Sequence, residues 1–63
     1  MKRIRQILTK NKTLKFYLIT DGQRHYNIEI RDCETEEKVE HGYCWQPCPS
    51  YAIDNVWYFL ENN

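Results

Sequence analysis

The residues best suited to chemistry are three cysteines and a histidine in the second half of the chain. His41, Cys44 and Cys48 follow one another at intervals of three and four residues, and Cys33 precedes them. Three thiolates and one imidazole can complete a tetrahedral zinc site, and a short chain gains stability from a metal. The spacing fits no standard zinc finger, however, and a strand would point His41 and Cys44 to opposite faces. We therefore expect no metal or other cofactor, with Cys44 and Cys48 as small semi-buried thiols.

The sequence offers little for catalysis. A nucleophilic cysteine would need His25 or His41 within hydrogen-bond reach, together with donors for an oxyanion. No glycine-rich loop supplies such donors, because Gly22 belongs to a turn signal and Gly42 to a strand pattern, where it indicates a bulge or a close backbone approach. The sequence therefore predicts a protein that is not an enzyme.

Length and charge limit the remaining functions. A chain of 63 residues forms one small domain, residues 1–63, with room for one sheet face and one helix. Nine basic and nine acidic residues balance, yet six basic residues precede the first acid at Asp21, and five acids lie between residues 32 and 40. Residues 1–12 thus form a basic N-terminal arm, whose charges either pair internally or contact a phosphate backbone.

The expected compartment follows from the cysteines and from the lack of long apolar runs. No apolar run follows the basic start, so no signal peptide is predicted, and no segment has the length needed to span a bilayer. Three cysteines, an odd number, suit a reducing compartment better than a disulfide scaffold. We expect a cytoplasmic protein with no membrane partner, and its size is typical of small bacterial or phage-encoded regulators.

Residues 13–31 carry the periodicity around which the fold is predicted. Apolar side chains recur at every second position over 14–18 and again over 26–30, which is typical of two half-buried strands. Between them Asp21-Gly22 is a turn signal, because glycine tolerates positive φ. A two-residue loop would set apolar against polar side chains, so we predict a three-residue loop over 21–23. The predicted pairs are Leu18 with Tyr26, Phe16 with Ile28, Leu14 with Ile30 and Lys15 with Glu29.

Two flanking segments are expected to extend this hairpin. Residues 2–12 have apolar positions at helical spacing, yet we favour a strand that turns at residues 10–12 over a short amphipathic helix. Residues 38–46 alternate as a further strand, which ends at Pro47 because proline cannot donate to a sheet ladder.

The register of this further strand is left with two alternatives. One opposes Ile28 to Val39 and Glu29 to Lys38, and the other opposes Ile30 to His41 and Arg31 to Glu40. The register between them would oppose Glu29 to Glu40 and Arg31 to Lys38, so we expect it not to form.

A C-terminal helix is predicted to begin at Pro49 or Ser50, since proline is favoured at the first helical position and serine at the cap. Its stripe toward the sheet consists of Ile53, Val56, Trp57 and Leu60. The predicted fold is α+β, an antiparallel β-meander of three strands, or four with the arm, and one C-terminal helix packed on one face. The apolar sheet face consists of Leu14, Phe16, Leu18, Tyr26, Ile28, Ile30, Val39, Tyr43 and Trp45.

A surplus of aromatic residues indicates a protein interface. Two tryptophans, five tyrosines and two phenylalanines exceed what one thin core can hold. Surplus tyrosine and tryptophan beside arginine is the composition of interaction hot spots. We predict a small protein-interaction module, a regulator or inhibitor that binds another protein or a second copy of itself. The predicted contact residues lie off the helix stripe or off the inner sheet face, and are Tyr17, Ile19, Tyr51 and Tyr58.

The alternative prediction is a small nucleic-acid-binding protein. Aromatic and basic side chains on an open sheet can stack on bases and neutralise phosphates. The basic arm would add phosphate contacts, which weaken steeply as salt rises. The residues assigned to this alternative are Lys2, Arg3, Arg5, Lys10, Lys12 and Arg24.

Overall fold

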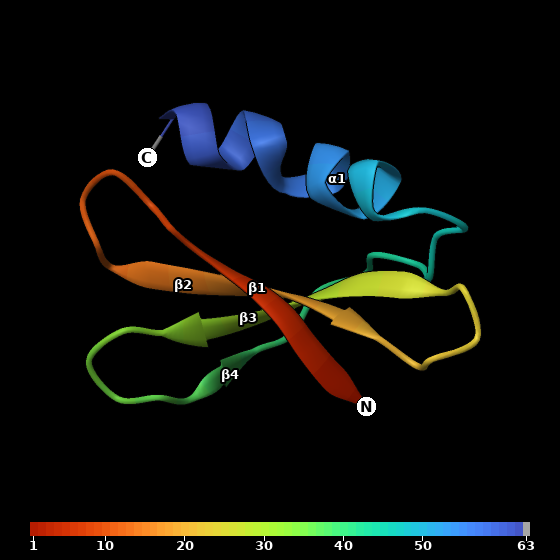
Figure 1. Ribbon diagram of the computed structural model, residues 1–63. Coiled ribbons are helices and arrows are strands. Elements are labelled where there is room, and N and C mark those ends of the chain that lie inside the picture. The colour runs from red at the N-terminus through yellow and green to blue at the C-terminus, as the bar shows by residue number, and fades with distance from the viewer. Residues whose placement is uncertain (63) are drawn as a thin grey trace.

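The computed structural model describes the backbone of residues 1–62 and the side chains of residues 1–58. The elements in chain order are β1 (Lys2–Leu8), β2 (Leu14–Thr20), β3 (Tyr26–Asp32), β4 (Lys38–Val39) and α1 (Pro49–Asn62). The four strands are antiparallel and lie in sequence order, and α1 lies along one face of their sheet (Figure 1). The predicted α+β meander with a C-terminal helix is confirmed, and β1 makes it four-stranded.

The register of β2 with β3 differs from the prediction by two residues. Leu18 lies opposite Ile28 rather than Tyr26, and Phe16 lies opposite Ile30. Because side chains alternate with a period of two, this shift leaves every side chain on its predicted face. The prediction of the pairs was therefore wrong, while the prediction of the core face of these two strands was right.

The loop between β2 and β3 explains the shift. It contains five residues, 21–25, instead of the predicted three. The Asp21 carboxylate accepts hydrogen bonds from the backbone N–H groups of Gln23 and His25, at 2.8 and 3.3 Å, and the Thr20 hydroxyl donates to the His25 carbonyl at 2.9 Å. These side chains replace the backbone bonds of a tighter turn, and Arg24 takes a left-handed conformation with φ of 63°.

The pairing of β3 with β4 is the register that was expected not to form. Ile30 lies opposite Val39, and Arg31 lies opposite Lys38. Two features remove the expected repulsion. β4 ends at Val39, so no Glu29–Glu40 pair exists, and the Arg31 guanidinium donates to the Glu36 carbonyl at 2.8 Å and lies 3.5 Å from the Glu29 Oε2 atom.

Residues 40–45 form a bulged segment in place of the predicted long strand. The chain rejoins β3 at Gln46, which exchanges two backbone hydrogen bonds with Tyr26 at 2.7 and 2.8 Å. A regular ladder counted back from the Ile30–Val39 pair would place Tyr43 there, so the segment contains three extra residues. His41 fills the gap in the ladder, because its Nε2 lies 2.5 Å from the Ile28 carbonyl oxygen and its Nδ1 accepts from the Tyr43 N–H at 3.1 Å.

The His41 contacts predict a measurable loss of stability on truncation. His41→Ala removes both hydrogen bonds and leaves a buried carbonyl and an N–H of the bulged segment without partners. We expect a loss of about 1–2 kcal/mol in the free energy of unfolding, measured by urea denaturation. His41→Gln, whose amide can donate to the same carbonyl, should recover part of that loss, and equal stability of all three proteins would contradict this role.

The core lies between the sheet and α1. Its buried members, each at most 7% exposed, are Phe16, Leu18, Ile28, Ile30, Ala52 and Val56. The predicted helix stripe is wrong at Trp57, which is 55% exposed, whereas Ala52 is fully buried. Leu60 lies outside the described side chains. Val39 and Trp45, predicted for the apolar sheet face, are exposed. Val39 lies on the two-residue edge strand β4, and Trp45 belongs to residues 40–45, which leave the ladder.

Candidate interaction surfaces

The structure does not bring the four candidate metal ligands together. Both ring nitrogens of His41 are hydrogen-bonded within the domain, and the Cys48 Sγ lies 3.3 Å from the Ser50 Oγ at the start of α1. Across the described residues no group of three or more His, Cys, Asp or Glu side chains could hold a metal ion. All three cysteines are free thiols, and the hydroxyl of Ser50 lowers the pKa of Cys48.

The outward face of α1 carries three large aromatic side chains. Tyr51, Trp57 and Tyr58 are 56, 55 and 77% exposed, whereas Ala52 and Val56 are fully buried against the sheet. At about 100° per residue, Tyr51 and Tyr58 lie within about 20° of each other around the helix, and Trp57 lies on the same outward half. We call this surface the aromatic helix face. It consists of Tyr51, Asp54, Trp57 and Tyr58.

Sequence reasoning identified part of this face. Tyr51 and Tyr58 were predicted as contact residues because they lie off the expected stripe, and the structure places both at the surface. Trp57 was missed because it fits the same i, i+3, i+4 pattern that Ala52 satisfies in its place. Only packing against the sheet distinguishes the two rotations of the helix.

The sheet face turned away from α1 is not the open surface that was predicted. Ile19 is 6% exposed and lines a hollow of about 240 Å³ together with Met1, Lys38 and Trp45. Tyr17 is partly buried beneath the guanidinium of Arg3, whose Cζ lies 4.1 Å from the ring centroid. Neither predicted contact residue on this face therefore projects freely into solvent.

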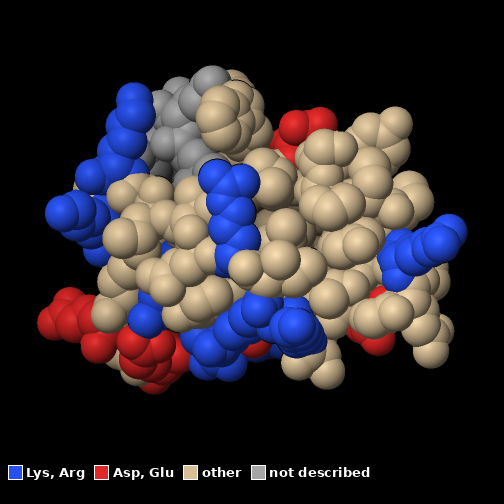
Figure 2. Space-filling model, in the orientation of Figure 1, with Lys and Arg blue, Asp and Glu red and all other residues tan. Residues whose placement is uncertain are grey.

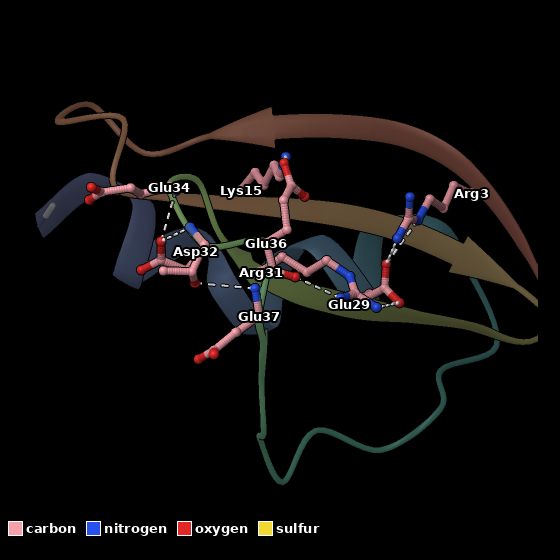
Figure 3. A network of polar contacts seen from close by, with 9 residues as sticks. Arg3, Lys15, Glu29, Arg31, Asp32, Glu34, Glu36 and Glu37 are labelled. Atoms are coloured by element: carbon pink, nitrogen blue, oxygen red, sulfur yellow. Dashed lines mark hydrogen bonds and ion pairs between the residues drawn. The ribbon is translucent and has the colours of Figure 1, made fainter.

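A charge network occupies the same sheet face (Figure 3). The Glu29 side chain is only 10% exposed, and its Oε1 accepts from the Nε and Nη2 atoms of Arg3 at 2.8 and 2.6 Å. The Arg31 Nη2 lies 3.5 Å from the Glu29 Oε2. Burial raises the pKa of Glu29, but the two guanidinium groups outweigh it and hold the pKa below its ordinary value. The predicted pairing of Lys15 with Glu29 does not form, since Lys15 pairs with Glu36 instead.

The basic residues predicted to contact nucleic acid do not form one surface. Arg3 is bound to Glu29 and stacked on Tyr17. Lys10 and Lys12 lie in the turn after β1, and Arg24 lies in the β2–β3 loop at the other end of the sheet. Figure 2 shows separate groups of basic side chains, with acidic side chains gathered at the lower left, where Figure 1 places the β3–β4 turn. The face in view thus presents no continuous basic patch.

The aromatic helix face and the exposed β1 remain as the surfaces from which function can be inferred. In the part of the chain that the structure describes, no helix has the length and apolar character to cross a membrane. No protein-family model matches the sequence, and no curated protein or solved structure is significantly similar to it.

Proposed function

We propose that this protein is a small, non-enzymatic interaction module of the cytoplasm, which regulates or inhibits another protein by binding it through the aromatic helix face. One observation supports this proposal above the others. Three aromatic side chains, each more than half exposed, share the outward half of a helix whose opposite half is the core. Three free thiols are consistent with a reducing compartment.

The energetics of binding favour such a surface. Tyrosine and tryptophan are the residues most enriched among interface hot spots, because they bury a large area while losing few rotatable bonds. The helix is already folded against the sheet through Ala52 and Val56, so binding would not have to order it. A helix presented in this way fits an apolar groove on a partner, and Asp54 between the rings complements a basic group at its rim.

A photo-cross-linking experiment with matched controls tests this function. A photoreactive phenylalanine analogue at position 58, expressed in the native host, should give a discrete cross-linked species. The same analogue at Gln23, an exposed residue of the β2–β3 loop, should not give it. Adding Trp57→Ala should reduce the cross-link at least about tenfold, because truncating a hot-spot aromatic residue costs about 2 kcal/mol of binding free energy.

The nucleic-acid alternative gives a different outcome. Fluorescence anisotropy with labelled single- and double-stranded DNA and RNA at low salt should show no binding. If an affinity appears that falls steeply with salt, is lost in the double variant Lys10→Glu/Lys12→Glu and survives Trp57→Ala, the proposed function is wrong.

A further inference from the structure

The two edges of the sheet differ in how much unpaired backbone they present to solvent. On the β3 side, β4, the His41 side chain and Gln46 occupy the edge in turn. On the other side, β1 has no neighbouring strand among the described residues, and six of its seven residues are exposed. The edge beyond β3 is therefore short and irregular, while β1 offers a longer row of backbone donors and acceptors to solvent.

The ladder geometry identifies which backbone groups are available on β1. The Thr9 N–H donates to the Leu14 carbonyl at 3.1 Å, and antiparallel pairs alternate between bonded and non-bonded along the strand. By this alternation the backbone groups of Gln6 and Leu8 point toward the open edge. The bulge between Arg3 and Arg5 interrupts the ladder, so the regular open edge covers residues 5–8, about 13 Å of strand.

The charge of β1 selects what can pair with it. Lys2, Arg3 and Arg5 lie on the strand, and no acidic residue precedes Asp21. Arg3 is already paired with Glu29, so Lys2 and Arg5 are the charges that can attract a partner. In Figure 2 some of the separate groups of basic side chains lie in the middle and lower part of the face, where β1 crosses the sheet in Figure 1. Lysine and arginine on an edge strand repel strands of like charge. Their positive charge attracts an acidic strand.

A second copy of the chain is a less complementary occupant, because it brings the same basic charge to the edge. A pair centred on Ile7 would join the outward backbone groups of Gln6 and Leu8 without opposing like charges directly, whereas a pair centred on Arg5 would oppose this residue to its own copy. Like charges directly opposite on neighbouring strands are destabilising. The complementary occupant is a segment of another protein with acidic residues at alternate positions.

We propose that β1 binds an extended acidic segment of a partner protein by strand addition along residues 5–8. Main-chain hydrogen bonds to Gln6 and Leu8 would supply affinity, and carboxylates beside Lys2 and Arg5 would supply selectivity. This surface is separate from the aromatic helix face and uses none of its residues, so the inference stands or falls independently of the proposed function.

Two synthetic nonapeptides test the proposal, acetyl-(Glu-Val)4-Glu-amide and acetyl-(Lys-Val)4-Lys-amide. With the ¹⁵N-labelled protein at low salt, the glutamate peptide should shift the amide signals of Gln6 and Leu8 saturably and slow their hydrogen exchange. The lysine peptide should do neither. Gln6→Pro removes an outward N–H from an edge strand, where proline is tolerated, and should weaken binding of the glutamate peptide at least tenfold.

Controls separate strand addition from other outcomes. Trp57→Ala should leave the affinity for the glutamate peptide unchanged. Should Gln6→Pro unfold the protein, a glutamate peptide with N-methylated valines makes the same test on the wild type and should bind at least tenfold more weakly. The proposal is overturned if the glutamate peptide causes no shifts at millimolar concentration, or if blocking the backbone leaves its affinity unchanged. A concentration-dependent dimer with protected Gln6 and Leu8 amides would also overturn it, because the occupant would then be a second copy.

Discussion

Phe16→Ala should leave the protein largely unfolded at room temperature. Phe16 is 1% exposed and lies at the centre of the core between the sheet and α1. Truncating a buried phenylalanine costs about 3–5 kcal/mol, whereas a domain of this size is stable by only about 3–6 kcal/mol in total. Circular dichroism and the spread of amide proton shifts should both report the loss of structure.

A control substitution that removes an exposed ring distinguishes the loss of core packing from the loss of an aromatic side chain. Tyr51→Ala removes a ring that is 56% exposed, so its free energy of unfolding should stay within about 0.5 kcal/mol of wild type. If Phe16→Ala instead remained folded and lost less than about 1.5 kcal/mol, the core would not be centred on this residue.

Glu29→Gln should both destabilise the protein and alter its response to acid. The substitution keeps the shape of the side chain but removes the charge that Arg3 and Arg31 share. We expect a loss of about 1–2 kcal/mol at pH 7, in the lower part of the range for hydrogen bonds to charged groups, because the Arg3 side chain is half exposed. Urea denaturation at pH 7 measures this loss.

The pH dependence has a definite sign. The pKa of Glu29 is lowered from 4.5 in the folded state, so the unfolded chain takes up its proton first as pH falls. The stabilisation is therefore complete well above pH 4.5 and is lost as pH falls through the folded pKa. In Glu29→Gln this part of the acid destabilisation should be absent. What remains reflects Asp21 and Asp32, whose pKa values backbone N–H groups lower from 3.8.

Glu36→Gln is the matched surface control. Its carboxylate pairs with Lys15 but is 62% exposed, so the loss at pH 7 should stay below about 1 kcal/mol. If Glu29→Gln lost no more stability than Glu36→Gln, or kept the full acid dependence of the wild type, the network around Glu29 would not stabilise the fold as described.

The faces of the strands were predictable because they depend only on alternation. Phe16 and Ile28 share the core face in either register of the hairpin, since the two registers differ by an even number of residues. The register itself depends on hydrogen bonds from Asp21 and Thr20 to loop backbone, which no periodicity encodes. Gly42 indicated a bulge as one alternative, but the early end of β4 at Val39 was not predicted, because the His41 side chain replaces a strand donor there.

The surface was less predictable than the core faces. Ala52 and Trp57 both fit an apolar stripe, and the helix rotation that buries the small alanine leaves the tryptophan outside. Ile19 alternates outward on its strand, yet it is only 6% exposed, in a hollow that Met1 and Trp45 also line. Residues distant in sequence decide both cases, so alternation along one element cannot reveal them.

The free energy of unfolding of Trp57→Ala, measured by urea denaturation, tests most directly whether α1 has one face in the core and the other exposed to solvent. We expect a value within about 0.5 kcal/mol of wild type, because the ring is more than half exposed. A loss of about 2 kcal/mol or more would place Trp57 in the core and contradict the aromatic helix face as a binding surface.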